Sequence, residues 1–325
     1  MHSFPHLNQI YSFIATHELI PQGSKVIVGL SGGPDSVFLL HFLVTFAKQH
    51  KITLIAAHLD HEWRPESGQD AKFCQDLAQS LGILCVTRKI SDLGLSLKFN
   101  GSKEAIARQA RRHFFAMAKK ETDADLIALA HHAQDQQETF FIRMMRGATL
   151  TGLTGIKPRQ DGYVRPLLQT NKQDILNYLH TNNIAYLTDS TNASDAYLRN
   201  RIRMHVLPAL QKCDTRFDAN FLSTMTRLQE TEQFLQELTA HIFEQIAQLD
   251  NCAWHLEVDK LFTMHTIMQY RLVLYWLCQE NVQFPTTESF FDEILRFLHT
   301  PDSGTHAIYP TWSLVKKNNL VWIKK

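Results

Sequence analysis

The chain has 325 residues, a formal net charge of +1, and 44% apolar and 20% charged residues. Domains typically take about 100–200 residues, so this length predicts two of them. The composition is that of an ordinary globular protein and excludes a disordered chain. The near-neutral charge excludes a polycation, so any nucleic-acid contact must depend on basic residues that are gathered locally.

The five cysteines are widely spaced, and no Cys-x-x-Cys pair is present. Neither a zinc ribbon nor an iron–sulfur site is supported, and free thiols in a reducing compartment are expected. The N-terminus lacks a basic region followed by a long apolar core, and the longest apolar run, at 37–44, is too short to span a bilayer. We therefore expect a cytoplasmic protein with no membrane partner.

Short β-branched runs alternate with helical patterns between residues 24 and 130. Strands are expected at 25–29, 52–58, 83–88 and 126–130, and helices at 37–49, 69–81 and 103–121. Buried strands separated by helices predict an α/β fold with a doubly wound parallel sheet. Such sheets bind ligands at the carboxyl ends of their strands, so functional residues are expected after Leu30, His58 and Ala130.

The pattern becomes helical from about residue 171. A long amphipathic run at 221–249 predicts a helix, and further helices are expected at 266–279 and 288–298. Segments 305–308 and 313–323, the second broken at Asn318-Asn319, predict a small terminal strand cluster. We expect a catalytic domain at 1–213 and a mainly helical domain at 214–325.

The first expected strand ends in the loop Ser31-Gly-Gly-Pro-Asp-Ser36. The two glycines can adopt positive φ, and the proline suits the first turn of a helix. Free amides and the helix dipole favour an anion there, and Ser31 and Ser36 add hydroxyl donors. Asp35 repels phosphate unless a divalent cation lies between them. The loop therefore predicts an anion with a metal ion, and a plain strand–helix turn is the alternative.

The second expected strand ends in His58, Asp60 and His61. A His-x-x-His pair with an aspartate could bind zinc, although no H-E-x-x-H helix is present. Polar residues that line a solvated loop are the alternative.

The fourth expected strand is followed by His131-His-Ala-Gln-Asp-Gln-Gln-Glu-Thr139. If a helix starts near residue 133, Asp135 and Glu138 share one stripe, whereas Phe140, Phe141 and Met144 face the core. An acidic stripe at the ligand edge of the sheet suits a cationic ligand or a metal. A solvated helix face is the alternative.

Basic residues gather in two places. Arg108, Arg111 and Arg112 lie on one expected helix, and Arg199 and Arg203 are one helical turn apart. Guanidinium groups suit phosphate oxygens, which makes these arginines candidate triphosphate or nucleic-acid contacts. A solvated face is an equal alternative for any single arginine.

The loop at 31–36 resembles the SGGxDS loop of the N-type ATP pyrophosphatases, which cleave ATP between the α and β phosphates. A larger set of segments resembles the tRNA(Ile)-lysidine synthetase family in order and spacing: 58–67, 104–111, 131–139, 165–168, 189–192 and 199–208. The resemblance implies an enzyme that uses ATP to adenylate C2 of the first anticodon cytidine of an isoleucine tRNA with a CAU anticodon. L-lysine then attacks through its ε-amine and AMP is released.

The resemblance also implies residue roles. ATP would be held by Ser31, Gly32, Gly33, Pro34, Asp35, Ser36 and His58, with Asp35 binding Mg²⁺. Asp135 and Glu138 match positions tied to lysine binding. Phosphates, the adenylated cytidine or the lysine would be contacted by Arg108, Arg111, Arg199 and Arg203. The base that deprotonates the lysine is left open among His58, His131 and His132.

One departure from the family pattern concerns Gln134, because many relatives carry Asp-Asp where this chain has Gln134-Asp135. If the missing acid binds Mg²⁺, the metal needs another ligand here. Two other functions stay open: a related tRNA thiolase, for which a reactive cysteine pair is missing, and a non-catalytic nucleotide or RNA binder. The oligomeric state is also open, a homodimer included.

Overall fold

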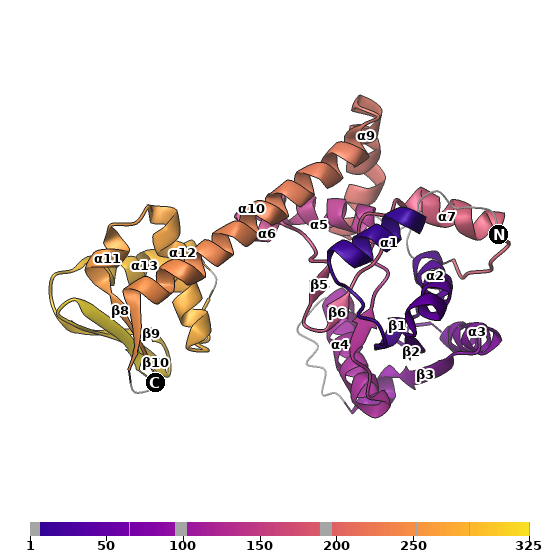
Figure 1. Cartoon of the computed structure of the whole chain (residues 1–325), viewed down its shortest axis with the longest axis horizontal. Coiled ribbons are helices and arrows are strands. Elements are labelled where there is room, and N and C mark those ends of the chain that lie inside the picture. Colours follow the sequence, from indigo (N-terminus) through magenta and orange to yellow (C-terminus); the bar gives the residue numbers. More distant parts are fainter. Residues whose placement is uncertain are drawn as a thin grey trace. The chain divides into compact units, whose positions relative to one another are not determined.

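The computed structural model describes residues 7–64, 66–94, 103–188, 197–250, 253–285 and 287–324 (Figure 1). The chain divides into two compact units, Met1–Thr226 and Arg227–Lys325. This division falls within α10 (Phe217–Ile246), whereas the boundary expected from the sequence precedes that helix. The domain limits 1–213 and 214–325 stay a proposal. Within the described ranges, no helix is both long and apolar enough to cross a membrane.

The first unit contains a six-stranded sheet in the order β3-β2-β1-β4-β6-β5. Its strands are β1 (Lys25–Gly29), β2 (Thr53–Asp60), β3 (Leu84–Lys89), β4 (Leu126–Ala128), β5 (Arg159–Gln160) and β6 (Tyr163–Val164). All neighbours are parallel except β5 and β6. The predicted parallel sheet is confirmed. The sequence pattern missed β5 and β6, because two residues are too few to show a period.

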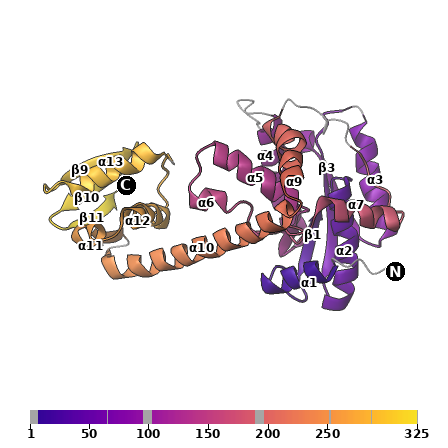
Figure 2. The same ribbon diagram turned by 90° about the horizontal axis from the view of Figure 1, so that it is seen from above.

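Helices cover both faces of this sheet (Figure 2). One face, with Val26 and Val28, packs against α1 (Leu7–Thr16), α2 (Pro34–His50), α3 (Ser67–Ser80) and α7 (Lys172–Thr181). The other face, with Ile27, packs against α4 (Lys103–Thr122). Successive side chains of a strand point to opposite faces, so each strand supplies both cores. The doubly wound arrangement expected from the sequence is confirmed.

Further elements of this unit are η1 (Ile90–Leu93), α5 (Ala133–Met145), α6 (Leu150–Leu153), α8 (Leu198–Arg201), η3 (Ile202–Val206) and α9 (Leu207–Cys213). The element η3 is a π-helical turn, in which Leu207 N–H donates to Ile202 O across five residues. Pro208 follows directly and has no N–H to donate to the carbonyl of Met204, so the regular ladder cannot continue there.

The second unit contains a five-stranded antiparallel sheet in the order β7-β8-β11-β10-β9. Its strands are β7 (Ala247–Asp250), β8 (Ala253–Glu257), β9 (Gly304–Tyr309), β10 (Trp312–Lys317) and β11 (Leu320–Lys324), and its helices are α11 (Val258–Phe262), α12 (Thr266–Gln279) and α13 (Glu288–His299). Trp276 of α12 is fully buried among Leu256, Leu314 and Val321 of the sheet. The predicted terminal strand cluster is confirmed. The expected helix at 221–249 ends earlier, because Ala247 already starts β7.

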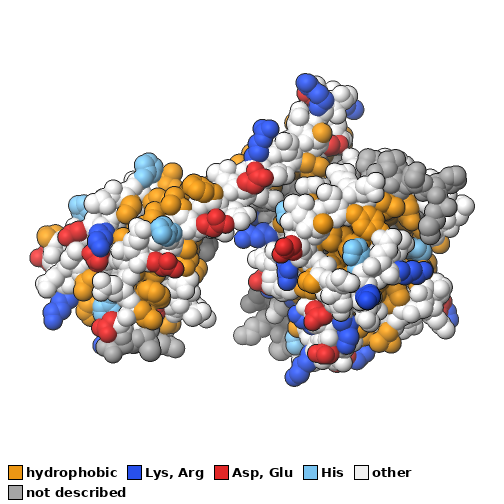
Figure 3. Space-filling view, viewed as in Figure 1, with side chains coloured by type: hydrophobic (Ala, Val, Ile, Leu, Met, Phe, Trp, Pro, Cys, Tyr) orange, Lys and Arg blue, Asp and Glu red, His pale blue; other side chains and the backbone are white. Residues whose placement is uncertain are grey.

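On the visible face of each unit, acidic and basic side chains are interspersed (Figure 3). This distribution agrees with the near-zero net charge of the chain.

Candidate active site

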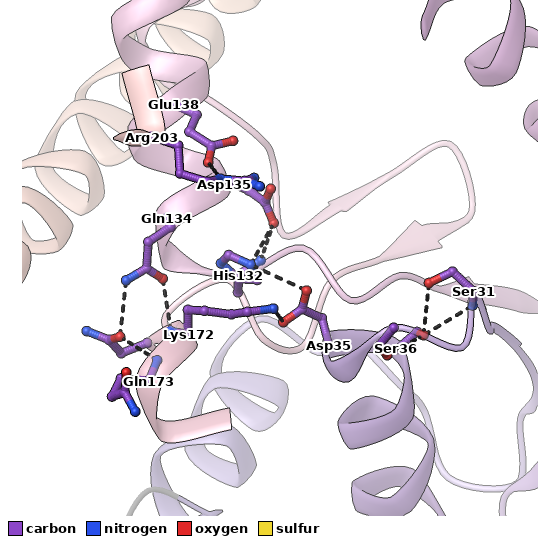
Figure 4. A network of polar contacts seen from close by, with 12 residues as sticks. Ser31, Asp35, Ser36, His132, Gln134, Asp135, Glu138, Lys172, Gln173 and Arg203 are labelled. Carbon is purple, nitrogen blue, oxygen red and sulfur yellow. Dashed lines mark hydrogen bonds and ion pairs between the residues drawn. The ribbon is translucent and has the colours of Figure 1, made fainter. Parts of the chain in front are cut away.

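The loop between β1 and α2 is held by its own serines (Figure 4). Ser31 N–H donates to Ser36 Oγ at 3.1 Å, and that hydroxyl in turn donates to Gly33 O at 2.9 Å. The two hydroxyls lie 3.1 Å apart. Because the first amides of a helix have no intrahelical acceptor, the start of α2 presents donors to an anion. Pro34 takes the expected first helical position.

The two glycines of the loop differ in conformation. Gly32 has φ +83°, and an added Cβ would lie 2.7 Å from Leu187 Cδ1. Leu187 N–H also donates to Gly32 O at 2.9 Å, so this segment packs directly on the loop. Gly33 has φ −70°, an ordinary extended conformation, and only Gly32 needs the positive φ that the sequence suggested for both.

Asp35 and Lys172 form an ion pair at the edge of this loop. Lys172 Nζ donates to Asp35 Oδ1 at 2.5 Å. The exposed fraction is 30% for the lysine side chain and 28% for the aspartate side chain. Lys172 is the first residue of α7, far from the loop in sequence. The loop at 31–36 contains no lysine of its own, and the fold brings one to it.

His132 lies between two carboxylates. Its Nε2 is 3.7 Å from Asp35 Oδ2 and 3.6 Å from Asp135 Oδ2, and the side chain is buried. His132 N–H also donates to Asp135 Oδ2 at 2.9 Å, which fixes the start of α5. The residues that follow β1 and β4 therefore meet at one edge of the sheet, as the parallel topology predicts.

Two acids of α5 are paired with two arginines that follow residue 197. Glu138 is fully buried and accepts from Arg199 Nε through one oxygen and from Arg203 Nε at 2.6 Å through the other. Arg199 also donates to Asp135 Oδ1 at 2.7 Å. Arg199 lies on α8 and Arg203 on η3, so the expected one-turn spacing directs both guanidinium groups to the same carboxylate.

Burial and neighbouring charges shift several pKa values here. Burial alone raises the pKa of Asp135, but His132, Arg199 and His131 outweigh it and lower this pKa to about 2. Burial lowers the pKa of His131 to about 4, with Asp135 opposing and Arg165 reinforcing the shift. Asp135 is thus ionised and His131 neutral near pH 7.

A family model described as the PP-loop domain matches residues 6–210 of this chain. The chain belongs to the PP-loop domain family. The matched residues include the loop at 31–36 and both acids of α5, so the site described above lies within the family domain.

Curated relatives of this chain are named tRNA(Ile)-lysidine synthase. One from Bacillus cereus is 32% identical over 309 residues, 92% of this chain and 65% of the relative. One from Bacillus subtilis is 36% identical over 307 residues, 92% of this chain and 64% of the relative. The chain thus spans somewhat less than two thirds of the length of these relatives.

A solved structure of similar fold is the U34-tRNA thiolase NcsA from Methanococcus maripaludis with its [4Fe-4S] cluster. The TM-score is 0.59 with 17% sequence identity, over 69% of this chain and 78% of that chain. At this identity the likeness concerns the fold alone, and it agrees with the α/β architecture described above.

The polar residues at the end of β2 make contacts within the protein. His58 is buried and its Nδ1 lies 2.9 Å from Leu30 O, while Asp60 Oδ1 accepts from Glu62 N–H at 2.8 Å. Burial, reinforced by the charge of Arg111, lowers the pKa of His61 to about 4. Among the described residues, no three His, Cys, Asp or Glu side chains gather as a metal-binding group. The zinc alternative for this strand end therefore has no support.

Mg²⁺ is a different case, because it keeps water and phosphate ligands and needs only one or two protein carboxylates. Asp35 fits this role, since it lies in the first turn of α2 beside the loop amides and is partly exposed. Gln134 is engaged elsewhere: its Oε1 accepts from Lys172 N–H at 2.9 Å, and its Nε2 donates to Asn171 Oδ1 at 3.1 Å.

The basic residues of α4 lie near residues that come after β2 and β4. Arg108 and Arg111 are exposed. Arg108 and Arg112 both line a shallow pocket along α4. Arg108 is close enough to Arg143 to contribute to lowering its pKa, although burial is the larger cause. Arg111 acts in the same way on His61. These arginines therefore approach the residues that follow β2 and β4.

Sequence reasoning made one error on α5 and missed one residue. Met144 is 47% exposed rather than in the core, because only the first two turns of α5 are enclosed. Phe140 does pack inward, with its ring 5.3 Å from that of Phe221. Lys172 was not anticipated, and no local signal marks it. The segment 189–192, part of the sequence resemblance, lies outside the described residues.

Proposed function

We propose that the chain uses ATP to attach L-lysine to C2 of the first anticodon cytidine of an isoleucine tRNA with a CAU anticodon. The observation that carries this proposal is the similarity, over 92% of the chain, to relatives named tRNA(Ile)-lysidine synthase. The site agrees with it, because the loop at 31–36 and the acid–arginine cluster meet through His132. In this proposal residues 214–325 help to bind the tRNA.

The first step is adenylation. The cytidine O2 attacks the α-phosphorus of ATP, an O–P bond forms, and the bond to the β-phosphate breaks to release pyrophosphate. The loop amides and the Ser31 and Ser36 hydroxyls would hold the departing pyrophosphate. A Mg²⁺ ion at Asp35 would neutralise part of the phosphate charge. Arg108 and Arg111 would contact the tRNA phosphates or the adenylated cytidine.

The second step is attack by lysine. The ε-amine forms a bond to C2, the C2–O bond breaks, and AMP leaves with the oxygen. Asp135 and Glu138 would orient the incoming ammonium, and a guanidinium of Arg199 or Arg203 would then turn toward the AMP phosphate. The ammonium must lose a proton before it attacks, and in this proposal His132 would accept it, supported by its position between two carboxylates.

Incubation of the purified chain with ATP, Mg²⁺, radiolabelled L-lysine and a CAU-anticodon isoleucine tRNA transcript tests the proposal. We expect AMP, pyrophosphate and tRNA-bound lysine in equal amounts. A transcript with uridine as the first anticodon base is the matched control and should acquire no lysine. Equal multiple-turnover AMP formation without tRNA, or with lysine omitted, would contradict the proposed reaction.

Two outcomes would favour the alternatives. Binding of nucleotide or tRNA with no AMP formation by the wild type would point to a non-catalytic binder. Iron or labile sulfide in the purified protein would favour a thiolase. Against the latter, burial raises the pKa of the Cys74 thiol to about 12, which makes it a poor nucleophile at neutral pH.

A further inference from the structure

We propose that Lys172 is the cation that binds the β- and γ-phosphates of ATP at the loop 31–36. This inference rests on the proposed ATP-dependent function and adds a phosphate-binding residue from a distant helix. In the GxxxxGK[ST] phosphate loop the lysine lies within the loop itself. Here the loop Ser31-Gly-Gly-Pro-Asp-Ser36 has no lysine, and α7 supplies one.

The ammonium group is at the place where phosphates would arrive. Lys172 Nζ contacts Asp35 Oδ1, and Asp35 lies in the first turn of α2, beside the amides that face an anion (Figure 4). Both side chains are partly exposed, so a ligand can reach them without unfolding the site. A lysine needed for packing alone would have no reason to place its ammonium group at the open edge of a loop.

The backbone of Lys172 is fixed by two contacts. Its N–H donates to Gln134 Oε1 at 2.9 Å, and the preceding Asn171 caps α7 by accepting from Gln173 N–H at 2.9 Å. The helix behind it packs on α2, where the rings of Phe38 and Tyr178 meet edge to face at 5.0 Å. The base of the lysine side chain is therefore anchored on both sides, and only its flexible end is free to follow a ligand.

Charge balance gives the ion pair a second use. Without ligand, Lys172 neutralises Asp35, which also has His132 Nε2 at 3.7 Å. If Mg²⁺ accompanies the nucleotide, Asp35 would hold it, and the Lys172 ammonium would then be available to the phosphate oxygens. One cation thus stabilises the empty loop and then the bound triphosphate.

Equilibrium binding to the 325-residue chain tests the inference without tRNA or lysine. The probes are the α,β-methylene analogue of ATP, pyrophosphate and AMP, each with Mg²⁺, measured by calorimetry. We expect Lys172→Met to weaken binding of the analogue and of pyrophosphate by roughly 10–100-fold, because one charge-assisted contact is lost. AMP binding should change less than about twofold, because AMP has no β- or γ-phosphate.

Two further variants separate binding from structure. Lys172→Arg keeps the charge and should recover most of the affinity for the analogue. Lys120→Met removes an exposed lysine of α4 and should leave all three affinities unchanged. If Lys172→Met does not fold, Lys172→Gln, compared with Lys172→Arg, replaces it.

The inference is overturned if Lys172→Met binds the analogue and pyrophosphate as wild type does, or if AMP binding falls by the same factor. Either result can occur while the wild type still forms lysidine, so it leaves the proposed function standing. Conversely, Lys172-dependent pyrophosphate binding in a protein that forms no lysidine would refute that function and support the role of Lys172.

Discussion

Arg203 Nε donates a hydrogen bond to Glu138 Oε1 at 2.6 Å, and the glutamate is fully buried. The other carboxylate oxygen accepts from Arg199, which also binds Asp135. Two acids and two arginines therefore balance in charge before any ligand binds. A cationic substrate would have to replace a guanidinium group, and the released arginine would become available to a phosphate.

Glu138→Gln should destabilise the fold. The substitution leaves two guanidinium groups facing a neutral amide, and breaking a buried ion pair in this way costs about 3–5 kcal/mol. The free energy of unfolding from urea titration measures the loss. The matched control is Glu121→Gln, whose pair with Arg88 is about 40% exposed on both sides and should contribute less than about 1 kcal/mol. Equal losses in the two variants would contradict the buried pairing.

The same Glu138→Gln variant should affect lysine more than ATP. If Glu138 helps to bind the lysine ammonium, the KM for lysine rises by roughly tenfold or more, while the KM for ATP changes little. Steady-state kinetics with each substrate varied in turn measure both constants. A larger rise for ATP would show that the lysine assignment is wrong.

The free energy of unfolding should decrease as the pH falls, because His131 becomes protonated more readily in the unfolded chain. Its folded-state pKa is lowered to about 4, chiefly by burial, from an ordinary value near 6.5. Below pH 6.5 the unfolded chain takes up a proton that the folded chain does not, so the stabilisation present above that pH is lost as pH falls toward 4. The loss from this group amounts to about 3 kcal/mol.

Urea unfolding of wild type and His131→Gln between pH 7.5 and 4 isolates that contribution. The variant should lose less stability over this range, because it has no imidazole to protonate. Parallel curves for the two proteins would mean that His131 titrates as an exposed histidine does.

Gly32→Ala should disrupt the loop, whereas Gly33→Ala should not. Gly32 has positive φ and no room for a Cβ beside Leu187, so alanine costs at least about 1–2 kcal/mol. At Gly33 the φ is ordinary and the nearest atom, Ser31 Oγ, is 3.5 Å from an added Cβ, so stability should stay constant or rise slightly. Thermal unfolding compares them, and a more destabilised Gly33→Ala would refute this account.

Gln134→Ala should loosen the placement of Lys172. It removes the acceptor of Lys172 N–H and the donor to Asn171, so we expect a loss of about 1–2 kcal/mol in stability and weaker binding of the ATP analogue. Gln173→Ala is the control, because the Gln173 side chain bonds the exposed Asn177 and the substitution should have no effect on nucleotide binding. Unchanged analogue affinity in Gln134→Ala would remove the link between Gln134 and the phosphate site.

Local sequence patterns predicted those parts of the chain whose hydrophobic period was long enough to detect. The strand at 25–29 and the helix at 266–279 were expected at the bounds that the structure has. The expected helix at 221–249, in contrast, ends at Ile246, since pairing of Ala247 with Leu256 makes the last residues a strand. Such pairing depends on a partner that no local window contains.

For the site, sequence alone predicted which strand ends carry the candidate site residues, because parallel strands separated by helices bring their carboxyl ends to one edge. It also predicted a tight loop before a helix at 31–36, since glycine and proline have distinct backbone preferences. Only the tertiary structure decided that Lys172 approaches Asp35 and that Arg199 and Arg203 share Glu138. Those pairs join residues far apart in the chain, and their contacts form when α7, α8 and η3 pack against the edge of the sheet.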